Sequence, residues 1–219
     1  MKFQAAIFDL DGTLIDSLAD LADSANEMLE HYGFPTHPVD PYRYFVGNGS
    51  RKLIERCLPK AKSTDTAFVD EALAYYKGCY ERRLLNKTVP YEGILEALHA
   101  LQEKGIPLGI VTNKHQSAAD AIAAKLFPAG MFVEVFGDRP GYPRKPDPKK
   151  PLMIAKEMHV APETVAYFGD TSVDMDTAKN AGFYAVGVTW GFRPKEELIE
   201  HGADILLDHP SEMLTKLNF

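Results

Sequence analysis

The sequence predicts an α/β protein, in which a Rossmann-like parallel sheet with helices on both faces carries an inserted all-helical domain. Three observations support this fold class. An apolar strand at residues 3–8 opens the chain and stops at Asp9. From residue 107 onward, short apolar strands alternate with helical patterns, as they do in parallel sheets covered on both faces. Between these two parts, only helical patterns occur.

The helical insert begins shortly after the first strand. Asp16 or Ser17 can cap a helix whose apolar residues recur at helical spacing until Gly33. Two further apolar stripes, at residues 53–58 and 68–80, fit the packed helices of a small bundle. Since ligands of an open parallel sheet bind beyond the carboxyl ends of its strands, the insert should lie at the rim of the binding site.

After a loop at residues 86–90, strands and helices alternate to the end of the chain. We expect an α/β core formed by residues 1–15 and 88–219, and a helical cap domain formed by residues 16–87. The elements expected in the second part of the core are helix 94–104, strand 107–112, helix 116–126, strand 132–136, helix 148–158, strand 165–168, helix 172–180, strand 184–188, helix 194–201, strand 204–207 and helix 210–217.

Composition and charge exclude several classes of function. The chain has 219 residues, of which 45% are hydrophobic and 25% are charged, and these values are ordinary for a globular protein. Its formal net charge is -7, and the nearest basic cluster, residues 144–150, is interrupted by prolines. We therefore expect no nucleic-acid partner. The apolar run at residues 3–8 is too short for a signal peptide or a membrane span, so we expect no membrane partner.

The two cysteines indicate a reducing compartment. Cys57 and Cys79 are too few for a disulfide framework and are not spaced as a metal-binding pair. We interpret them as reduced thiols and expect a cytoplasmic protein. The sequence does not distinguish a monomer from a homodimer.

Polar and acidic residues gather at the ends of the expected strands. Because parallel strands place their carboxyl ends on one edge of the sheet, these residues should share one site. The clusters are Asp9-Leu10-Asp11-Gly12-Thr13, Thr112-Asn113, Lys145 within Arg144-Lys145-Pro146-Asp147-Pro148, and Gly169-Asp170 followed by Asp174.

Several carboxylates at one site require a cation. Two like charges about 4 Å apart repel by roughly 4 kcal/mol at an effective dielectric constant of 20. A site that gathers Asp9, Asp170 and Asp174 around an anionic substrate should therefore bind a divalent ion. Mg²⁺ fits best, because it shares its coordination shell among a few carboxylates, water and phosphate oxygens.

The set of motifs resembles that of the haloacid dehalogenase-like superfamily of phosphohydrolases. Within it, the chain is similar to the phosphoglycolate phosphatase-like branch, which carries a helical cap after the first motif. The motifs follow the family's order over essentially the whole chain, and Asp-x-Asp-Gly-Thr is the specific one, since the others mean little alone. The resemblance implies a phosphatase that hydrolyses a small, phosphoglycolate-like phosphate monoester through an aspartyl-phosphate, with Mg²⁺ as cofactor.

The resemblance also implies roles for the aspartates. Asp9 is the expected nucleophile and a metal ligand. Asp11 is the expected acid and base, which protonates the leaving oxygen, later deprotonates the attacking water, and offers its backbone carbonyl to the metal. Asp170 and Asp174 are expected to complete the metal shell, Asp174 either directly or by orienting another ligand.

The other motif residues are expected to bind the phosphoryl group. By the same resemblance, Thr112 and Asn113 hold its oxygens, and Lys145 offsets the charge on Asp9 and the phosphate. Gly12 allows a sharp turn that brings backbone N–H groups to the phosphate.

The insert contains a glycine-rich turn at residues 47–51. It resembles the cap loop that faces the catalytic aspartates and selects the substrate in this family. We therefore expect Asn48 or Arg51 to contact the non-phosphate end of the substrate. The plainer interpretation of this turn is the start of a helix at Ser50.

Two other functions are compatible with parts of the pattern. A phosphomutase of the beta-phosphoglucomutase type uses the same two aspartates, Asp9 and Asp11, and returns the phosphoryl group to a sugar. A non-enzymatic module that binds or signals through a phospho-aspartate also places acids at strand ends. Such a receiver-like module is shorter and has no helical insert, and a degenerate regulatory relative would be expected to have lost Asp9, Asp11 or Lys145.

Overall fold

The computed structural model describes residues 2–219, and its centre is a six-stranded sheet. All neighbouring strands pair in parallel, in the order β5-β4-β1-β6-β7-β8. Their bounds are β1 (Ala5–Phe8), β4 (Leu108–His115), β5 (Glu134–Asp138), β6 (Val165–Gly169), β7 (Tyr184–Val188) and β8 (Ile205–Leu207). The predicted α/β fold class is therefore confirmed.

Helices cover both faces of the sheet. Along β1 the side chains alternate between the faces, so that Phe8 packs into one apolar core and Ile7 into the other. The first face is covered by α6 (Ile94–Glu103), α7 (Gln116–Leu126) and α11 (Glu212–Lys216). The second is covered by α8 (Lys149–Glu157), α9 (Ser172–Ala181) and α10 (Lys195–Glu200), and a 3₁₀ helix at Pro162–Thr164 precedes β6.

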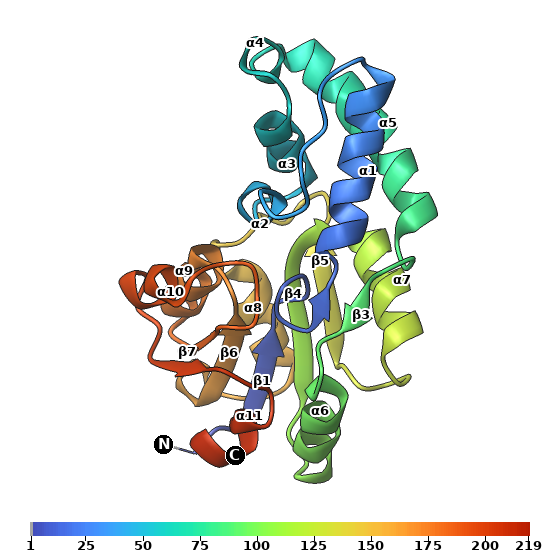
Figure 1. Ribbon diagram of the computed structural model, residues 1–219. Coiled ribbons are helices and arrows are strands. Elements are labelled where there is room, and N and C mark those ends of the chain that lie inside the picture. Colours follow the sequence, from blue (N-terminus) through green and yellow to red (C-terminus); the bar gives the residue numbers. More distant parts are fainter. Residues whose placement is uncertain (1) are drawn as a thin grey trace.

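A group of helices, called the cap below, lies beyond one end of the sheet, at the top of Figure 1. It consists of α1 (Leu18–His31), α2 (Tyr42–Phe45), α3 (Ser50–Cys57), α4 (Lys60–Ser63) and α5 (Thr66–Arg83). The cap has its own apolar core, which contains Met28, Ile54 and Tyr76. That core also takes in Phe192, a residue from the loop after β7.

The two chain segments that enter and leave the cap pair with each other. β2 (Ile15–Asp16) and β3 (Val89–Pro90) form a short antiparallel ladder. Beside it, Oδ2 of Asp20 accepts hydrogen bonds from the backbone N–H groups of Lys87 and Thr88 and from the Thr88 hydroxyl, at 2.7–2.9 Å. These bonds join the start of α1 to the segment that leaves the cap.

Most predicted strands and helices of the core agree with the structure within a few residues, but β4 differs in its length. The expected strand stopped at residue 112, whereas β4 continues to His115, with an irregular register against β5 after Val111. Thr112, Asn113 and Lys114 therefore lie on the strand itself, where their polar side chains gave no strand signal. Within residues 2–219, no helix is long and apolar enough to cross a membrane.

Candidate active site

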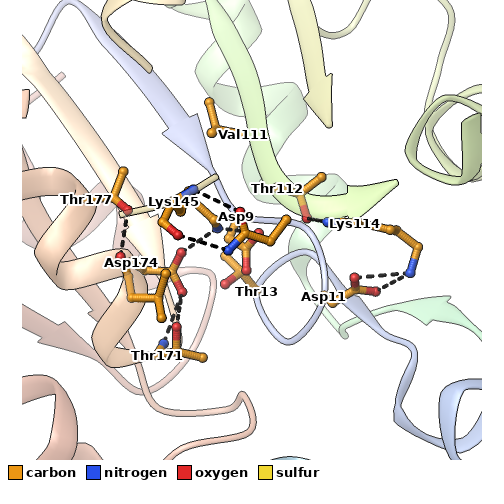
Figure 2. A network of polar contacts seen from close by, with 12 residues as sticks. Asp9, Asp11, Thr13, Val111, Thr112, Lys114, Lys145, Thr171, Asp174 and Thr177 are labelled. Carbon is orange, nitrogen blue, oxygen red and sulfur yellow. Dashed lines mark hydrogen bonds and ion pairs between the residues drawn. The ribbon is translucent and has the colours of Figure 1, made fainter. Parts of the chain in front are cut away.

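The carboxyl end of β1, the loop before α8 and the first turn of α9 bring together one lysine and two aspartates. The ammonium of Lys145 lies 2.6 Å from Oδ1 of Asp174 and 2.7 Å from Oδ1 of Asp9, and Figure 2 shows it between the two carboxylates. All three side chains are almost fully buried. The contact with Asp174 is a hydrogen bond, whereas the contact with Asp9 is an ion pair outside hydrogen-bond geometry.

A third aspartate, Asp170, closes this group. Its Oδ1 accepts a hydrogen bond from the Thr13 hydroxyl at 3.1 Å, and its Oδ2 accepts one from the backbone N–H of Phe192 at 2.8 Å. Gly12 adopts a φ of +86°, and a Cβ atom there would lie 2.2 Å from Asp170 Oδ2. Only glycine allows the first motif to turn this close to Asp170.

Asp174 serves the start of α9 as well as the site. Its Oδ2 accepts hydrogen bonds from the backbone N–H and the hydroxyl of Thr171, at 3.1 and 2.7 Å, and the two residues form a capping box. Its Oδ1 faces Lys145. The helix start therefore holds this carboxylate in a single orientation.

The three carboxylates fit a divalent cation. Each of Asp9, Asp170 and Asp174 offers an oxygen, and these oxygens lie within 4.8 Å of one another. Within residues 2–219, Asp9 Oδ1 is buried and accepts no hydrogen bond of ordinary geometry, and the ammonium of Lys145 contacts it as an ion pair. A donor set of oxygens alone matches the preference of Mg²⁺. The side chain of Asp11 is not in this group, and a contact between its backbone carbonyl and the metal stays a prediction.

The pKa values of these groups reflect a crowded, buried site. Burial raises the pKa of Asp9 from 3.8 to about 7, an effect that Lys145 opposes and Asp174 increases. Burial, Asp174 and Asp9 hold the pKa of Asp170 well above its ordinary value. Burial alone would lower the pKa of Lys145, but Asp174 and Asp9 raise it well above its ordinary value. Lys145 therefore stays charged, while the carboxylates need a further cation to ionise together.

Thr112 and Asn113 lie at the end of β4 and line the same cavity as Asp9. The side-chain amide of Asn113 accepts a hydrogen bond from the backbone N–H of Lys145 at 2.9 Å and donates to the Lys145 carbonyl at 3.3 Å. It also donates to the carbonyl of Gly47 in the cap at 3.1 Å. Its amide is thus engaged in holding the Lys145 segment, so a direct contact with the phosphoryl group stays a prediction.

Asp11 has its own lysine partner, which the sequence analysis did not assign. Lys114 donates from Nζ to both carboxylate oxygens of Asp11, at 2.8 and 3.1 Å, and the hydroxyl of Ser17 donates to Oδ1 at 2.5 Å. Figure 2 shows this pair apart from the group around Lys145. Lys114 follows Thr112 and Asn113 directly, and its position beside the motif was the only signal in the sequence.

A cavity of about 140 Å³ lies between the carboxyl ends of the strands and the cap. Asp9, Asp11 and Thr112 line its core side. Its cap side is formed by residues of α1, α3, α5 and the loop before α3, together with Phe192: Leu21, Val46, Gly47, Gly49, Ser50, Leu53, Tyr76, Lys77, Tyr80 and Glu81.

The structure does not bring the side chains of Asn48 and Arg51 to this cavity. Arg51 forms ion pairs with Asp70 and Glu55, and Asn48 accepts a hydrogen bond from Arg56 at 2.7 Å. Their neighbours Gly47, Gly49 and Ser50 line the cavity instead (with Gly47 and Gly49 at positive φ). The glycine-rich turn therefore lines the same cavity as Asp9 and Asp11, while the side chains of Asn48 and Arg51 are paired elsewhere.

Comparisons with known proteins identify the family of the chain. A family model described as haloacid dehalogenase-like hydrolase matches residues 6–188. A phosphoglycolate phosphatase from Psychrobacter arcticus is 34% identical over 221 residues, covering 97% of this chain and 91% of its own. An N-acetylmuramic acid 6-phosphate phosphatase from Pseudomonas aeruginosa is 30% identical over 222 residues, covering 100% of this chain and 96% of its own.

A solved structure shows the same fold from end to end. It is the structure of a protein from Lactobacillus delbrueckii subsp. bulgaricus that was assigned as a phosphoglycolate phosphatase without an experimental demonstration of activity. The two structures have a TM-score of 0.91 and 31% sequence identity over 97% of each chain. The chain belongs to the haloacid dehalogenase-like hydrolase family, and within the family to the phosphatases. The resemblance inferred from the sequence motifs is thus confirmed.

Proposed function

We propose that this phosphatase hydrolyses a small phosphate monoester through a covalent intermediate on Asp9, with Mg²⁺ held by Asp9, Asp170, Asp174 and the backbone carbonyl of Asp11. The observation that carries the proposal is the position of Lys145 between Asp174 and Asp9, because Asp9 itself lines the cavity beneath the cap. The bound cation would neutralise charge on the carboxylates and on the transferring phosphoryl group.

The residues of the chain supply the other steps. A carboxylate oxygen of Asp9 attacks phosphorus, and the bond from phosphorus to the leaving oxygen breaks while Asp11 protonates that oxygen. A water molecule, deprotonated by Asp11, then attacks the aspartyl-phosphate, releases phosphate and restores Asp9. Lys145 and Thr112 stabilise the phosphoryl oxygens in both steps.

The substrate is a small phosphorylated metabolite whose organic part fits under the cap. The relative of this chain from Psychrobacter arcticus is a phosphoglycolate phosphatase, and this supports a phosphoglycolate-like substrate for the present chain. The backbone around Gly47 and Ser50 is the proposed contact for the end of the substrate away from phosphorus. In this proposal the cap domain, residues 16–87, selects the substrate, and the protein works in the cytoplasm.

Steady-state phosphate release tests the proposal against its alternatives. We expect turnover of 4-nitrophenyl phosphate and phosphoglycolate with Mg²⁺, and loss of turnover with EDTA or with Asp9→Asn. A non-enzymatic phospho-aspartate module predicts no turnover of either compound. A phosphomutase predicts conversion of a hexose 1-phosphate into its 6-phosphate in place of phosphate release.

A further inference from the structure

We propose that Lys114 is a positioning residue for proton transfer, which holds the Asp11 carboxylate at the cavity and stabilises the charge that develops on it. The inference rests on the proposed phosphatase mechanism, because it assumes that Asp11 is the acid and base. It adds a residue outside the motifs, and it connects this acid to the cap.

The contact between Lys114 and Asp11 is close and shielded from water. The Lys114 side chain is only 4% exposed, against 18% for Asp11, and both Asp11 oxygens lie within 3.1 Å of its ammonium nitrogen. Ser17, at the start of the cap, donates a third hydrogen bond to the same carboxylate. Three donated bonds leave the carboxylate little freedom to rotate.

The two lysines keep the two catalytic carboxylates apart. Asp9 and Asp11 are separated by a single residue, yet Lys145 pairs with Asp9 and Lys114 pairs with Asp11. Asp9 is thereby turned toward Asp170 and Asp174, the proposed metal ligands, whereas the Asp11 side chain lies outside that group. This division suits one carboxylate that attacks phosphorus and another that exchanges protons with the leaving oxygen.

Lys114 also contacts the cap. Its ammonium lies 4.7 Å from the ring centroid of Tyr80 on α5, within the range of a cation–π interaction. Tyr80 is 8% exposed and lines the cavity. The position of Lys114, and with it that of Asp11, therefore depends on α5 lying over the site.

The chemical role of Lys114 follows from the charges in the first step. When Asp11 gives its proton to the leaving oxygen, the bond from phosphorus to that oxygen breaks and a carboxylate forms on Asp11. The Lys114 ammonium stabilises this carboxylate and keeps its own protons throughout. In the second step Asp11 takes a proton from water, and its charge is neutralised again.

The dependence of the rate on the leaving group tests this role. An alkyl phosphate needs a proton on its leaving oxygen, whereas 4-nitrophenolate leaves without one. The comparison uses kcat/KM, which reports steps up to the phosphorylation of Asp9. For Lys114→Met we expect kcat/KM to fall about 10- to 100-fold with propyl phosphate, which is part of the loss expected when a general acid is removed entirely. With 4-nitrophenyl phosphate we expect kcat/KM to fall less than about threefold.

A double-mutant cycle separates this role from a structural one. Asp11→Asn should show the same selectivity for the leaving group, and adding Lys114→Met to it should cause less than about a further twofold loss, because both changes remove one function. Lys125→Met, which removes an exposed lysine on α7, should leave both rate constants unchanged. Thermal unfolding of each variant reports its stability separately.

Two results would overturn the proposal. Equal losses with both substrates would make Lys114 a structural residue, and additive losses in the double variant would make its effect independent of Asp11. A failure of the proposed function gives a different result, because Asp9→Asn would then retain activity or Asp11→Asn would show no selectivity for the leaving group.

Discussion

The backbone N–H of Phe192 donates a hydrogen bond to Asp170 Oδ2 at 2.8 Å, while the side chain of Phe192 is buried in the apolar core of the cap. One residue thus joins a proposed metal ligand to the helices that cover the site. The neighbouring Gly191 accepts a hydrogen bond from Arg43 of the cap at 2.9 Å, which supports the same connection. Displacement of the cap should therefore disturb Asp170.

The first prediction concerns this connection. Complete removal of an outer-shell partner lowers metal affinity about 10- to 100-fold. Phe192→Leu keeps the backbone N–H and only loosens its position, so it should weaken Mg²⁺ binding by less, about three- to tenfold. Calorimetric titration of the metal-free protein with Mg²⁺ measures the affinity directly. Phe34→Leu is the matched control, because Phe34 packs against the same cap core without touching Asp170. Equal affinities in the two variants would refute the connection.

The second prediction concerns Lys145. Lys145→Met leaves Asp9 and Asp174 as buried carboxylates without their cation, which should destabilise the metal-free protein by about 3–5 kcal/mol. Saturating Mg²⁺ should restore part of this stability, whereas kcat should stay at least about 100-fold below wild type. Denaturant unfolding with and without Mg²⁺ checks the first part. Lys149→Met, an exposed neighbour, should change neither quantity.

The third prediction concerns pH and Asp9. Its pKa rises from 3.8 to about 7 in the folded chain, so between these values the folded state binds more protons than the unfolded state. The protonated Asp9 side chain therefore makes its full contribution to the free energy of unfolding of the metal-free protein below about pH 4. This contribution is lost as the pH rises through about 7. Asparagine at this position does not titrate and should not show this loss.

Melting curves in EDTA measure this effect. From pH 5 to pH 8, the Tm of wild type should fall by several degrees relative to the Tm of Asp9→Asn. A change of 1 kcal/mol in the free energy of unfolding corresponds to about 2–4 °C in a protein of this size. Added Mg²⁺ should reduce the difference at pH 8. A Tm difference that is the same at both pH values would show that the pKa of Asp9 is not raised.

The fourth prediction concerns the cap loop. Because Arg51 pairs with Asp70 and Glu55, Arg51→Ala should lower stability by less than about 1 kcal/mol, as for exposed ion pairs, and change kcat/KM by less than about threefold. Ser50→Val, at a position that lines the cavity, should change kcat/KM for different phosphates by different factors. A large loss with Arg51→Ala across several substrates would restore Arg51 as a substrate contact.

The sequence predicted the parts of the site that depend on strand ends. Apolar runs stop at Asp9 and at Asp170, and parallel strands bring such ends together, so these carboxylates could be expected to meet. The clustering of acids then indicated a cation on electrostatic grounds alone. Lys145 was placed in the site by its resemblance to the family motif.

Other features depend on contacts that leave no pattern in the sequence. The link from Phe192 to Asp170 uses a backbone N–H, which every residue but proline has. The pairing of Lys114 with Asp11 depends on how far β4 extends. The last residues of β4 are polar, so the apolar pattern in the sequence did not indicate its full length. The orientation of Arg51 is set by Asp70 on another helix, so the turn alone could not reveal it.

The most direct test of the central claim is to find the phosphoryl group on Asp9. Asp11→Asn, which lacks the base for the second step, is mixed with 4-nitrophenyl phosphate and Mg²⁺, quenched in acid within one turnover, and digested for mass spectrometry. We predict a peptide containing Asp9 that is heavier by one phosphoryl group, and no such peptide when EDTA is present. A phosphoryl group on another residue, or turnover that continues in Asp9→Asn, would contradict the account.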